Sequence, residues 1–197
     1  MLLKPLPILL LIFCSKKDST QQKCIFSAFI FCIVGDLCLM SGKVILFELG
    51  AGSFLFAHLL YIRAFCSDIS WNLLIHGLRK QKIFRVISIA FLLSILVYNV
   101  YSLWDKSPCR LLFITYGVTM TTMATCAILR RDDHQELNES YWRFVIGGIL
   151  FVISDSTIAA LKFNGIQMNI TDFFIMATYY SAQTLIFLGA SCQKLRK

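Results

Sequence analysis

Long apolar segments separated by short basic stretches constrain this chain more than any other feature of its sequence. Seven such segments occur: Met1–Cys14, Cys24–Met40, Val44–Phe65, Ile83–Trp104, Leu111–Leu129, Phe144–Phe163 and Ile170–Cys192. A helix needs about 20 predominantly apolar residues to cross a bilayer, and all but the first segment approach or exceed that length. The first is shorter and carries Lys4, Pro5 and Pro7. We therefore predict an all-α, polytopic membrane helix bundle of about seven transmembrane helices.

Composition excludes the main alternatives to a membrane protein. Hydrophobic residues make up 57% of the chain and charged residues only 15%, against roughly 25% charged residues in soluble domains. The mean hydropathy is +0.70, and the segments leave only short connections, so we predict a single integral membrane domain over residues 1–197. The net charge of +8 does not indicate nucleic-acid binding, because no basic helix remains outside the apolar segments.

The positions of the basic residues predict how the chain is oriented in the membrane, since Lys and Arg concentrate on the cytosolic side. One side of the predicted bundle holds thirteen of them: Lys16, Lys17, Lys23, Arg79, Lys80, Lys82, Arg85, Arg130, Arg131, Arg143, Lys194, Arg196 and Lys197. The other side holds only five: Lys4, Lys43, Lys106, Arg110 and Lys162. We therefore predict that the C-terminus is cytosolic.

We make one further prediction for each of two connections on the predicted cytosolic side. Ser67–Lys82 is the longest and ends in a basic cluster, which we interpret as a topology signal, with attraction of anionic lipid as the alternative. Arg130–Arg143 contains both signs of charge. We predict that this second stretch is a solvated loop.

Two carboxyl groups lie where a bilayer should exclude them. Asp36 and Asp155 are each flanked by apolar residues inside a predicted span. A carboxylate at membrane depth costs several kcal/mol, so it faces the bundle interior or a water-filled cavity and marks a candidate functional site. The structural alternative is an interhelical strut, for example an ion pair with Arg63. Two such residues in one small bundle favour the functional interpretation.

Other polar side chains accompany these carboxyl groups inside the predicted spans. His58 and Tyr61 are three residues apart and therefore share a helix face. Gln183 follows a pair of tyrosines by one turn, and a buried amide must find hydrogen-bond partners. Tyr116 adds a hydroxyl group in the fifth segment. The structural alternative for these residues is hydrogen bonding between helices.

Several chemistries are not indicated by the residues present. The chain has three His residues, of which only His58 lies inside a predicted span, so a multi-histidine zinc site cannot be assembled. Its eight Cys residues form no C-x-x-C pair and suggest neither a disulfide framework nor a metal knuckle. We predict no metal and no cofactor, which leaves acid–base chemistry by carboxyl groups.

Four short motifs follow one another along the chain in a defined order and spacing. They are Gly35–Asp36, His58–Tyr61, Gly148–Ser156 and Tyr179–Gln183. Taken together, they resemble the lysoplasmalogenase (YhhN-like) family of membrane proteins over nearly the whole chain. Members of that family typically carry eight helices, and we expect that the first of these is missing here.

The resemblance implies a hydrolase that cleaves the vinyl ether bond of lysoplasmalogens and releases a fatty aldehyde and glycerophosphoethanolamine or glycerophosphocholine. This reaction begins with protonation of a carbon atom and passes through an oxocarbenium ion, a species that glycosidases handle with two carboxyl groups. We therefore predict Asp36 and Asp155 as the catalytic acid and base, in either order. The predicted substrate-binding residues are His58, Tyr61, Tyr116, Ser154, Tyr180 and Gln183.

The resemblance also implies a cellular setting. The partners would be a lysophospholipid substrate and membrane lipids, and the location would be the endoplasmic reticulum. We expect the substrate headgroup to approach at the basic cytosolic face. The headgroup preference and a homo-oligomeric state are left open. The alternative from another class is a seven-helix proton-coupled carrier or receptor-like binding protein, in which the two Asp residues relay protons.

Overall fold

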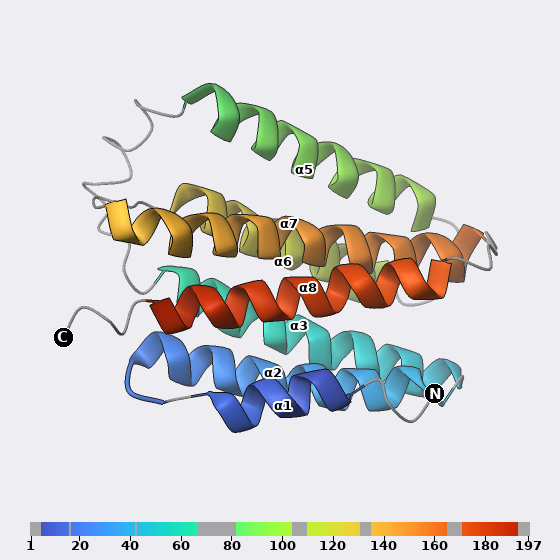
Figure 1. Ribbon diagram of the computed structural model, residues 1–197. Coiled ribbons are helices and arrows are strands. Elements are labelled where there is room, and N and C mark those ends of the chain that lie inside the picture. The colour runs from blue at the N-terminus through green and yellow to red at the C-terminus, as the bar shows by residue number, and fades with distance from the viewer. Residues whose placement is uncertain are drawn as a thin grey trace.

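The computed structural model describes residues 5–15, 17–41, 43–66, 82–103, 110–130, 135–164 and 171–192, and all regular structure in these ranges is helical. The helices are α1 (Leu6–Cys14), α2 (Thr20–Leu39), α3 (Val44–Cys66), α5 (Lys82–Leu103), α6 (Arg110–Leu129), α7 (Gln135–Asn164) and α8 (Thr171–Cys192). They lie side by side in one bundle (Figure 1). The predicted connection Ser67–Lys82 lies outside the described residues except for Lys82, the first residue of α5.

Six of the described helices are long and apolar enough to cross a membrane, as judged by length and composition. The exception is α1, which has nine residues. Large apolar side chains such as Leu37, Val97 and Leu111 are exposed on the outer faces of the helices, as expected where lipid is the surrounding solvent. The predicted all-α, polytopic membrane bundle is therefore confirmed, with six long spans and a short first helix in the described part of the chain.

The start of α2 shows a local signal that the apolar pattern does not contain. The helix begins at Thr20, ahead of the predicted start at Cys24. Ser19 caps it, because its hydroxyl oxygen accepts a hydrogen bond from the Gln22 backbone N–H at 3.1 Å, and the Gln22 side chain accepts one in return from the Ser19 backbone N–H at 3.4 Å. This reciprocal capping box satisfies donors that a helix N-terminus otherwise leaves unpaired.

The prediction that Arg130–Arg143 is a solvated loop was wrong, because α7 begins within this stretch. Glu139 and Arg143 are one helical turn apart and form an ion pair with an N–O distance of 2.9 Å. Ser140 is buried and donates a hydrogen bond to the Gly189 carbonyl of α8 at 2.8 Å. Interactions within the helix and with its neighbour therefore extend α7 beyond its apolar segment.

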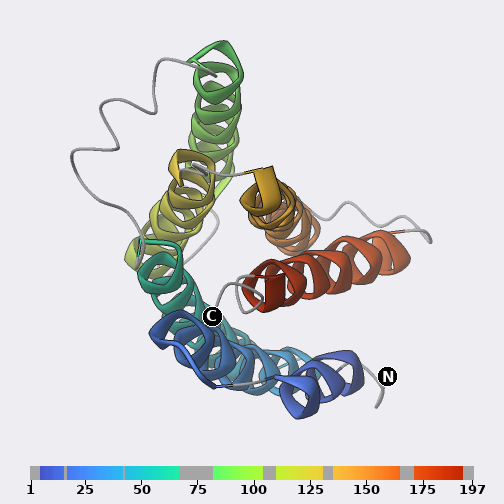
Figure 2. The same cartoon turned by 60° about the vertical axis from the view of Figure 1, so that its left-hand side comes forward.

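The bundle is built from closely packed helix pairs. α2 packs most extensively on α3 and α7 on α8, while α6 contacts α3, α5 and α7. A glycine permits the close approach of α7 and α8, since a Cβ atom on Gly147 would lie 3.1 Å from the carbonyl oxygen of Ala182. α5 lies at the outer edge of the bundle against α6 and α7 (Figure 2).

One end of the bundle is important for the site described below, and we call it the α2–α3 end. Here α2 ends and α3 begins, and the same end of the bundle holds the ends of α5 and α7 and the starts of α6 and α8 (Figure 1). The predicted orientation assigns this end to the side opposite the cytosol. Of the described basic residues, Lys23, Arg85 and Arg130 lie toward the other end, at the starts of α2 and α5 and after the end of α6.

Candidate active site

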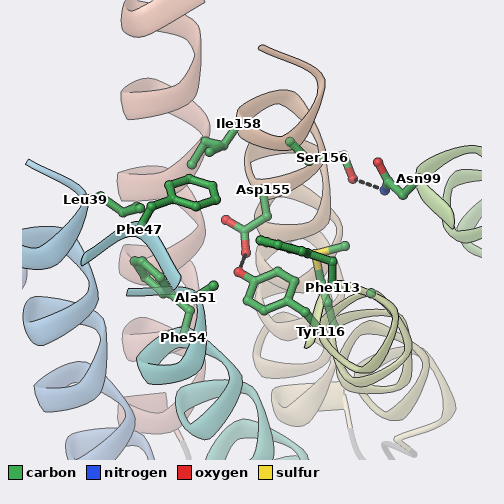
Figure 3. A pocket seen from close by; sticks show the side chains of 13 residues that line it. Leu39, Phe47, Ala51, Phe54, Asn99, Phe113, Tyr116, Asp155, Ser156 and Ile158 are labelled. Atoms are coloured by element: carbon green, nitrogen blue, oxygen red, sulfur yellow. Dashed lines mark hydrogen bonds between the residues drawn. The ribbon is translucent and has the colours of Figure 1, made fainter. Parts of the chain in front are cut away.

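A cavity of about 60 Å³ lies among α3, α5, α6 and α7 and contains Asp155, and we call it the Asp155 cavity (Figure 3). Its walls are mainly apolar: Leu39, Phe47, Ala51, Phe54, Phe113, Gly117, Met120, Ile158 and Ala159. Its polar lining residues are Asn99, Tyr116, Asp155 and Ser156. Because one water molecule needs roughly 10–15 Å³ of such volume, the cavity has room for several.

Among the described residues, Asp155 is held by polar contacts to one of its carboxyl oxygens only. The Tyr116 hydroxyl group donates a hydrogen bond to its Oδ2 atom, and Nε2 of His58 lies 3.6 Å from the same oxygen. The other carboxyl oxygen, Oδ1, points into the cavity (Figure 3). The carboxyl group is therefore fixed in orientation while one of its oxygens stays available to a ligand.

His58 is the second polar group beside the cavity. Its side chain is fully buried, with the Tyr116 ring at 5.1 Å and the Phe151 ring at 5.0 Å, both edge-on. Neither ring nitrogen has a hydrogen-bond partner among the described residues. Since buried polar groups are nearly always hydrogen-bonded, an exception of this kind calls for a functional explanation.

A second polar cluster lies between α2, α3 and α8. We call Cys32, Asp36, Tyr61, Tyr179 and Gln183 the closed cluster. Tyr61 donates a hydrogen bond to Gln183 Oε1 at 2.5 Å, and Gln183 Nε2 donates one to Cys32 Sγ at 3.2 Å. Tyr179 donates to Asp36 Oδ2 at 3.2 Å. All five residues are buried, and none of them lines the Asp155 cavity.

Aromatic rings separate the Asp155 cavity from the closed cluster. Phe54 lines the cavity and contacts the Tyr179 ring at 6.1 Å between centroids. Phe151 lies between Tyr179 at 5.5 Å and His58 at 5.0 Å. The position of Phe54 depends on Gly35, because a Cβ atom there would come within 2.6 Å of its ring. The residue before Asp36 therefore determines where one wall of the cavity lies.

The predicted site residues fall into two groups. Asp155 and Tyr116 line the cavity, and His58 lies beside Asp155 without lining it, whereas Asp36, Tyr61 and Gln183 belong to the closed cluster. The two predicted catalytic carboxyl groups therefore do not line one common cavity in this structure.

Three further residues that the sequence analysis named, Ser154, Tyr180 and Arg63, belong to neither group. Ser154 is buried and donates a hydrogen bond to the Ile175 carbonyl at 3.2 Å, and Tyr180 is partly exposed. Arg63, the suggested ion-pair partner, is exposed in the last turn of α3, whereas both Asp residues are buried.

The sequence-based prediction missed residues of both the closed cluster and the Asp155 cavity. Tyr179 precedes Gln183 by four residues and Tyr180 by three, and both spacings are compatible with one helix face, but the structure buries Tyr179 and leaves Tyr180 partly exposed. Cys32 is likewise four residues before Asp36 on α2. Asn99 and Ser156 line the cavity, but nothing in the sequence indicates that α5 and α7 bring them together.

The cavity lies toward the α2–α3 end of the bundle. Leu39 and Phe47 flank the turn between α2 and α3, and Asn99 lies near the end of α5. Asp36 is in the last turn of α2. The expectation that the headgroup approaches at the basic face therefore does not fit the cavity, since the polar groups are grouped near the opposite end.

No metal centre accompanies this site in the described ranges, where His, Cys, Asp and Glu side chains form no group that could hold a metal ion. The fold and the site define a polytopic helical membrane protein with a carboxyl group in a mainly apolar cavity.

The chain belongs to the YhhN family, which it matches over residues 1–190. The resemblance inferred from the four motifs is therefore confirmed. The chain is also 31% identical over 159 residues to lysoplasmalogenase TMEM86B from Sus scrofa. This alignment covers 80% of the present chain and 59% of the relative, so the chain spans well under two thirds of that protein. No solved structure matches the chain.

Proposed function

We propose that this chain is a membrane hydrolase that cleaves the vinyl ether bond of lysoplasmalogens, giving a fatty aldehyde and glycerophosphoethanolamine or glycerophosphocholine. The observation that carries the proposal is the geometry of Asp155, whose Oδ2 is held by Tyr116 while Oδ1 faces an apolar cavity. The relative named lysoplasmalogenase supports the choice of substrate.

The reaction needs a proton donor aimed at a carbon atom. The acid protonates the alkene carbon that is not bonded to oxygen, and the C=C electron pair forms the new C–H bond. The resulting oxocarbenium ion takes up water at the carbon bonded to oxygen, and a base removes one proton from that water. The hemiacetal then breaks its C–O bond, releasing the aldehyde and the glycerol hydroxyl group. One water molecule is consumed.

Asp155 is the acid in this proposal because its carboxyl group lines the cavity. Oδ1 delivers the proton, and the resulting carboxylate accepts a proton from the attacking water, which restores the acid. The Tyr116 hydrogen bond keeps the carboxyl group in one orientation. His58, 3.6 Å from Oδ2, stabilises the carboxylate between the two proton transfers.

Asp36 is the second carboxyl group in this proposal. It lies in the closed cluster and does not line the cavity, and the residue before it, Gly35, faces the Phe54 ring that does. A negative charge there attracts an oxocarbenium ion, and a low-dielectric interior strengthens the attraction. Its hydrogen bond from Tyr179 keeps the carboxylate in place.

The size of the cavity indicates which part of the lipid it holds. About 60 Å³ accommodates water and the reacting bond, whereas pockets that enclose a whole ligand measure roughly 300–1,000 Å³. The alkenyl chain would therefore extend from the cavity along the lipid-facing surface of the bundle.

The test is aldehyde release by the purified 197-residue chain in detergent, with lysoplasmenylethanolamine as substrate and a chelator present. Run in D₂O, carbon protonation places one deuterium on the carbon next to the aldehyde carbonyl, which mass spectrometry detects. The lysophospholipid with an ester at the same position serves as the control and should release no fatty acid. A chain with a cooperative melting transition that binds lysoplasmalogen without releasing aldehyde would support the carrier or receptor alternative and overturn the proposal.

A further inference from the structure

The Asp155 cavity contains a polar pair that the proposed reaction does not use. Asn99 of α5 donates a hydrogen bond from Nδ2 to the Ser156 hydroxyl oxygen of α7 at 3.0 Å. Both side chains line the cavity, and the pair lies on the α5 side of Asp155 (Figure 3). Asn99 is 7% exposed.

The pair retains hydrogen-bonding capacity beyond its mutual bond. An amide side chain has two N–H donors and an acceptor oxygen, and a hydroxyl group has one donor. The bond between Asn99 and Ser156 uses one amide hydrogen and one lone pair of the hydroxyl oxygen. Among the described residues, the amide oxygen of Asn99 and the hydroxyl hydrogen of Ser156 have no further partner and are available for a ligand group that both donates and accepts.

The place of the pair in the cavity relates it to the reacting bond. Ser156 and Asp155 both come from α7, and both side chains line the same cavity. The free hydroxyl group of a lysoplasmalogen is on the glycerol carbon next to the one that carries the vinyl ether oxygen. A ligand whose hydroxyl group binds at Ser156 therefore brings its vinyl ether toward Asp155.

We propose that Asn99 and Ser156 form a subsite for the free 2-hydroxyl group of the lysolipid, and that this subsite selects substrates that carry no acyl chain there. The hydroxyl group donates to the amide oxygen of Asn99 and accepts from the hydroxyl group of Ser156. This inference rests on the proposed function, because it names a specificity determinant for the same cavity.

The subsite explains selection in two ways. A substrate that lacks the hydroxyl group leaves buried polar atoms unpaired, and sites built to bind a hydroxyl group reject such analogues strongly. A substrate acylated at this position has no donor for the Asn99 amide oxygen. Its ester group, which is larger than a hydroxyl group, would also have to fit beside Asn99 and Ser156 in a cavity of about 60 Å³.

The test compares two substrates and three variants. The substrates are lysoplasmenylethanolamine and its 2-deoxy analogue, in which hydrogen replaces the hydroxyl group. The variants are Asn99→Leu, Ser156→Ala and the control Ser94→Ala, which alters an exposed serine of the same α5 helix. Aldehyde release gives kcat/KM for each combination, and the melting temperature reports on folding.

We expect the unmodified chain to prefer the hydroxyl substrate by roughly 10- to 100-fold in kcat/KM. Asn99→Leu should abolish this preference by slowing only the hydroxyl substrate, Ser156→Ala should reduce it in part, and Ser94→Ala should preserve it. Ser156→Ala tests the subsite independently if Asn99→Leu does not fold.

Different results overturn different proposals. Equal losses on both substrates in the folded variants would assign the pair a structural role and overturn the subsite. So would an unmodified chain that shows no preference between the substrates. A folded chain that releases aldehyde from neither substrate overturns the proposed function itself.

Discussion

The Asp155 cavity and the closed cluster contain similar polar groups that are buried to a similar extent, but the two regions differ in how these groups are hydrogen-bonded. Each contains an aspartate that is 8% exposed and accepts a hydrogen bond from a tyrosine of another helix. In the closed cluster, Tyr61, Gln183 and Cys32 are joined in one chain of hydrogen bonds. Behind Asp155, the imidazole of His58 does not line the cavity and has no hydrogen-bond partner among the described residues.

Under the proposed function, this difference means that burial alone does not identify a functional polar group in this membrane bundle. Polar groups that satisfy one another specify how the helices pack. The closed cluster does so across the interface of α2 and α8, which pack on each other much less extensively than α2 and α3 do. Polar groups with unused hydrogen-bonding capacity beside a cavity can instead act on a ligand.

Among the variants that distinguish the Asp155 cavity from the closed cluster, we expect Asp155→Asn to have the largest effect on activity. The amide cannot donate the proton that the reaction needs, so aldehyde release should fall by roughly 10²- to 10⁴-fold. The melting temperature should change little, because an amide oxygen can still accept the Tyr116 hydrogen bond. Initial rates and thermal unfolding in the same detergent measure both quantities.

Two matched variants control this experiment. Asp172→Asn makes the same change at an exposed position in the first turn of α8 and should retain activity. Asp36→Asn should lose activity by a smaller factor than Asp155→Asn, because Asp36 does not line the cavity. An Asp155→Asn chain that retains full aldehyde release would remove Asp155 from the acid role.

Lengths of apolar segments were sufficient to predict most of the fold. They indicate helices because a chain in lipid must satisfy its backbone hydrogen bonds within each span. They could not indicate the polar start of α7, which depends on a contact with α8 through Ser140. They also could not indicate the capped start of α2 at Ser19, which depends on side-chain chemistry and not on hydropathy.

The sequence could predict which polar residues lie inside the bundle but not how the structure arranges them. The rule that lipid excludes carboxyl groups selects Asp36 and Asp155 without any structure. Their distribution between two environments follows from how the helices pack, and no pattern within a single segment contains that information. The choice between Tyr179 and Tyr180 is of the same kind, since their spacings from Gln183 are both compatible with one helix face and only the packing buries Tyr179.

The Gly35→Ala variant tests the role of the Phe54 ring, which lines the Asp155 cavity and contacts Tyr179 of the closed cluster. The added methyl group would lie 2.6 Å from the Phe54 ring, so the ring must shift toward the cavity or α2 and α3 must separate. We expect a loss of about 1–3 kcal/mol in the free energy of unfolding, together with lower aldehyde release. Denaturation in detergent and initial rates measure the two effects.

Gly52→Ala is the matched control, because a Cβ atom there meets nothing within 4 Å. Alanine is favoured over glycine in a helix by up to about 1 kcal/mol, so this variant should be as stable as the unmodified chain or more so. If both variants behave alike, Phe54 does not depend on Gly35 for its position.

Tyr116→Phe should mainly affect activity. The variant removes the hydroxyl group that orients Asp155 and keeps the ring that packs against His58. A hydrogen bond to a charged group contributes roughly 1.5–3 kcal/mol, and its lower bound corresponds to about a tenfold fall in kcat/KM. Equal activity of the variant and the unmodified chain would show that Asp155 is oriented by other contacts.

Tyr61→Phe makes the same chemical change in the closed cluster and should show the opposite pattern. Loss of the hydroxyl group leaves Oε1 of Gln183 without its 2.5 Å hydrogen bond in a fully buried position. Hydrogen bonds between membrane helices contribute about 0.6–2 kcal/mol, so the expected effect is a loss of stability near 1 kcal/mol.

The control for this last variant is Tyr101→Phe, which removes the hydroxyl group of a tyrosine that is 83% exposed and should leave the melting temperature unchanged. Activity per folded molecule should fall less in Tyr61→Phe than in Tyr116→Phe, because Tyr61 contacts no atom of the cavity carboxyl group. If Tyr61→Phe instead retains its stability and loses activity tenfold, the hydrogen-bonded chain of Tyr61, Gln183 and Cys32 takes part in the reaction beyond the electrostatic role proposed for Asp36. Hydrogen-bond saturation would then not separate structural from functional polar groups in this bundle.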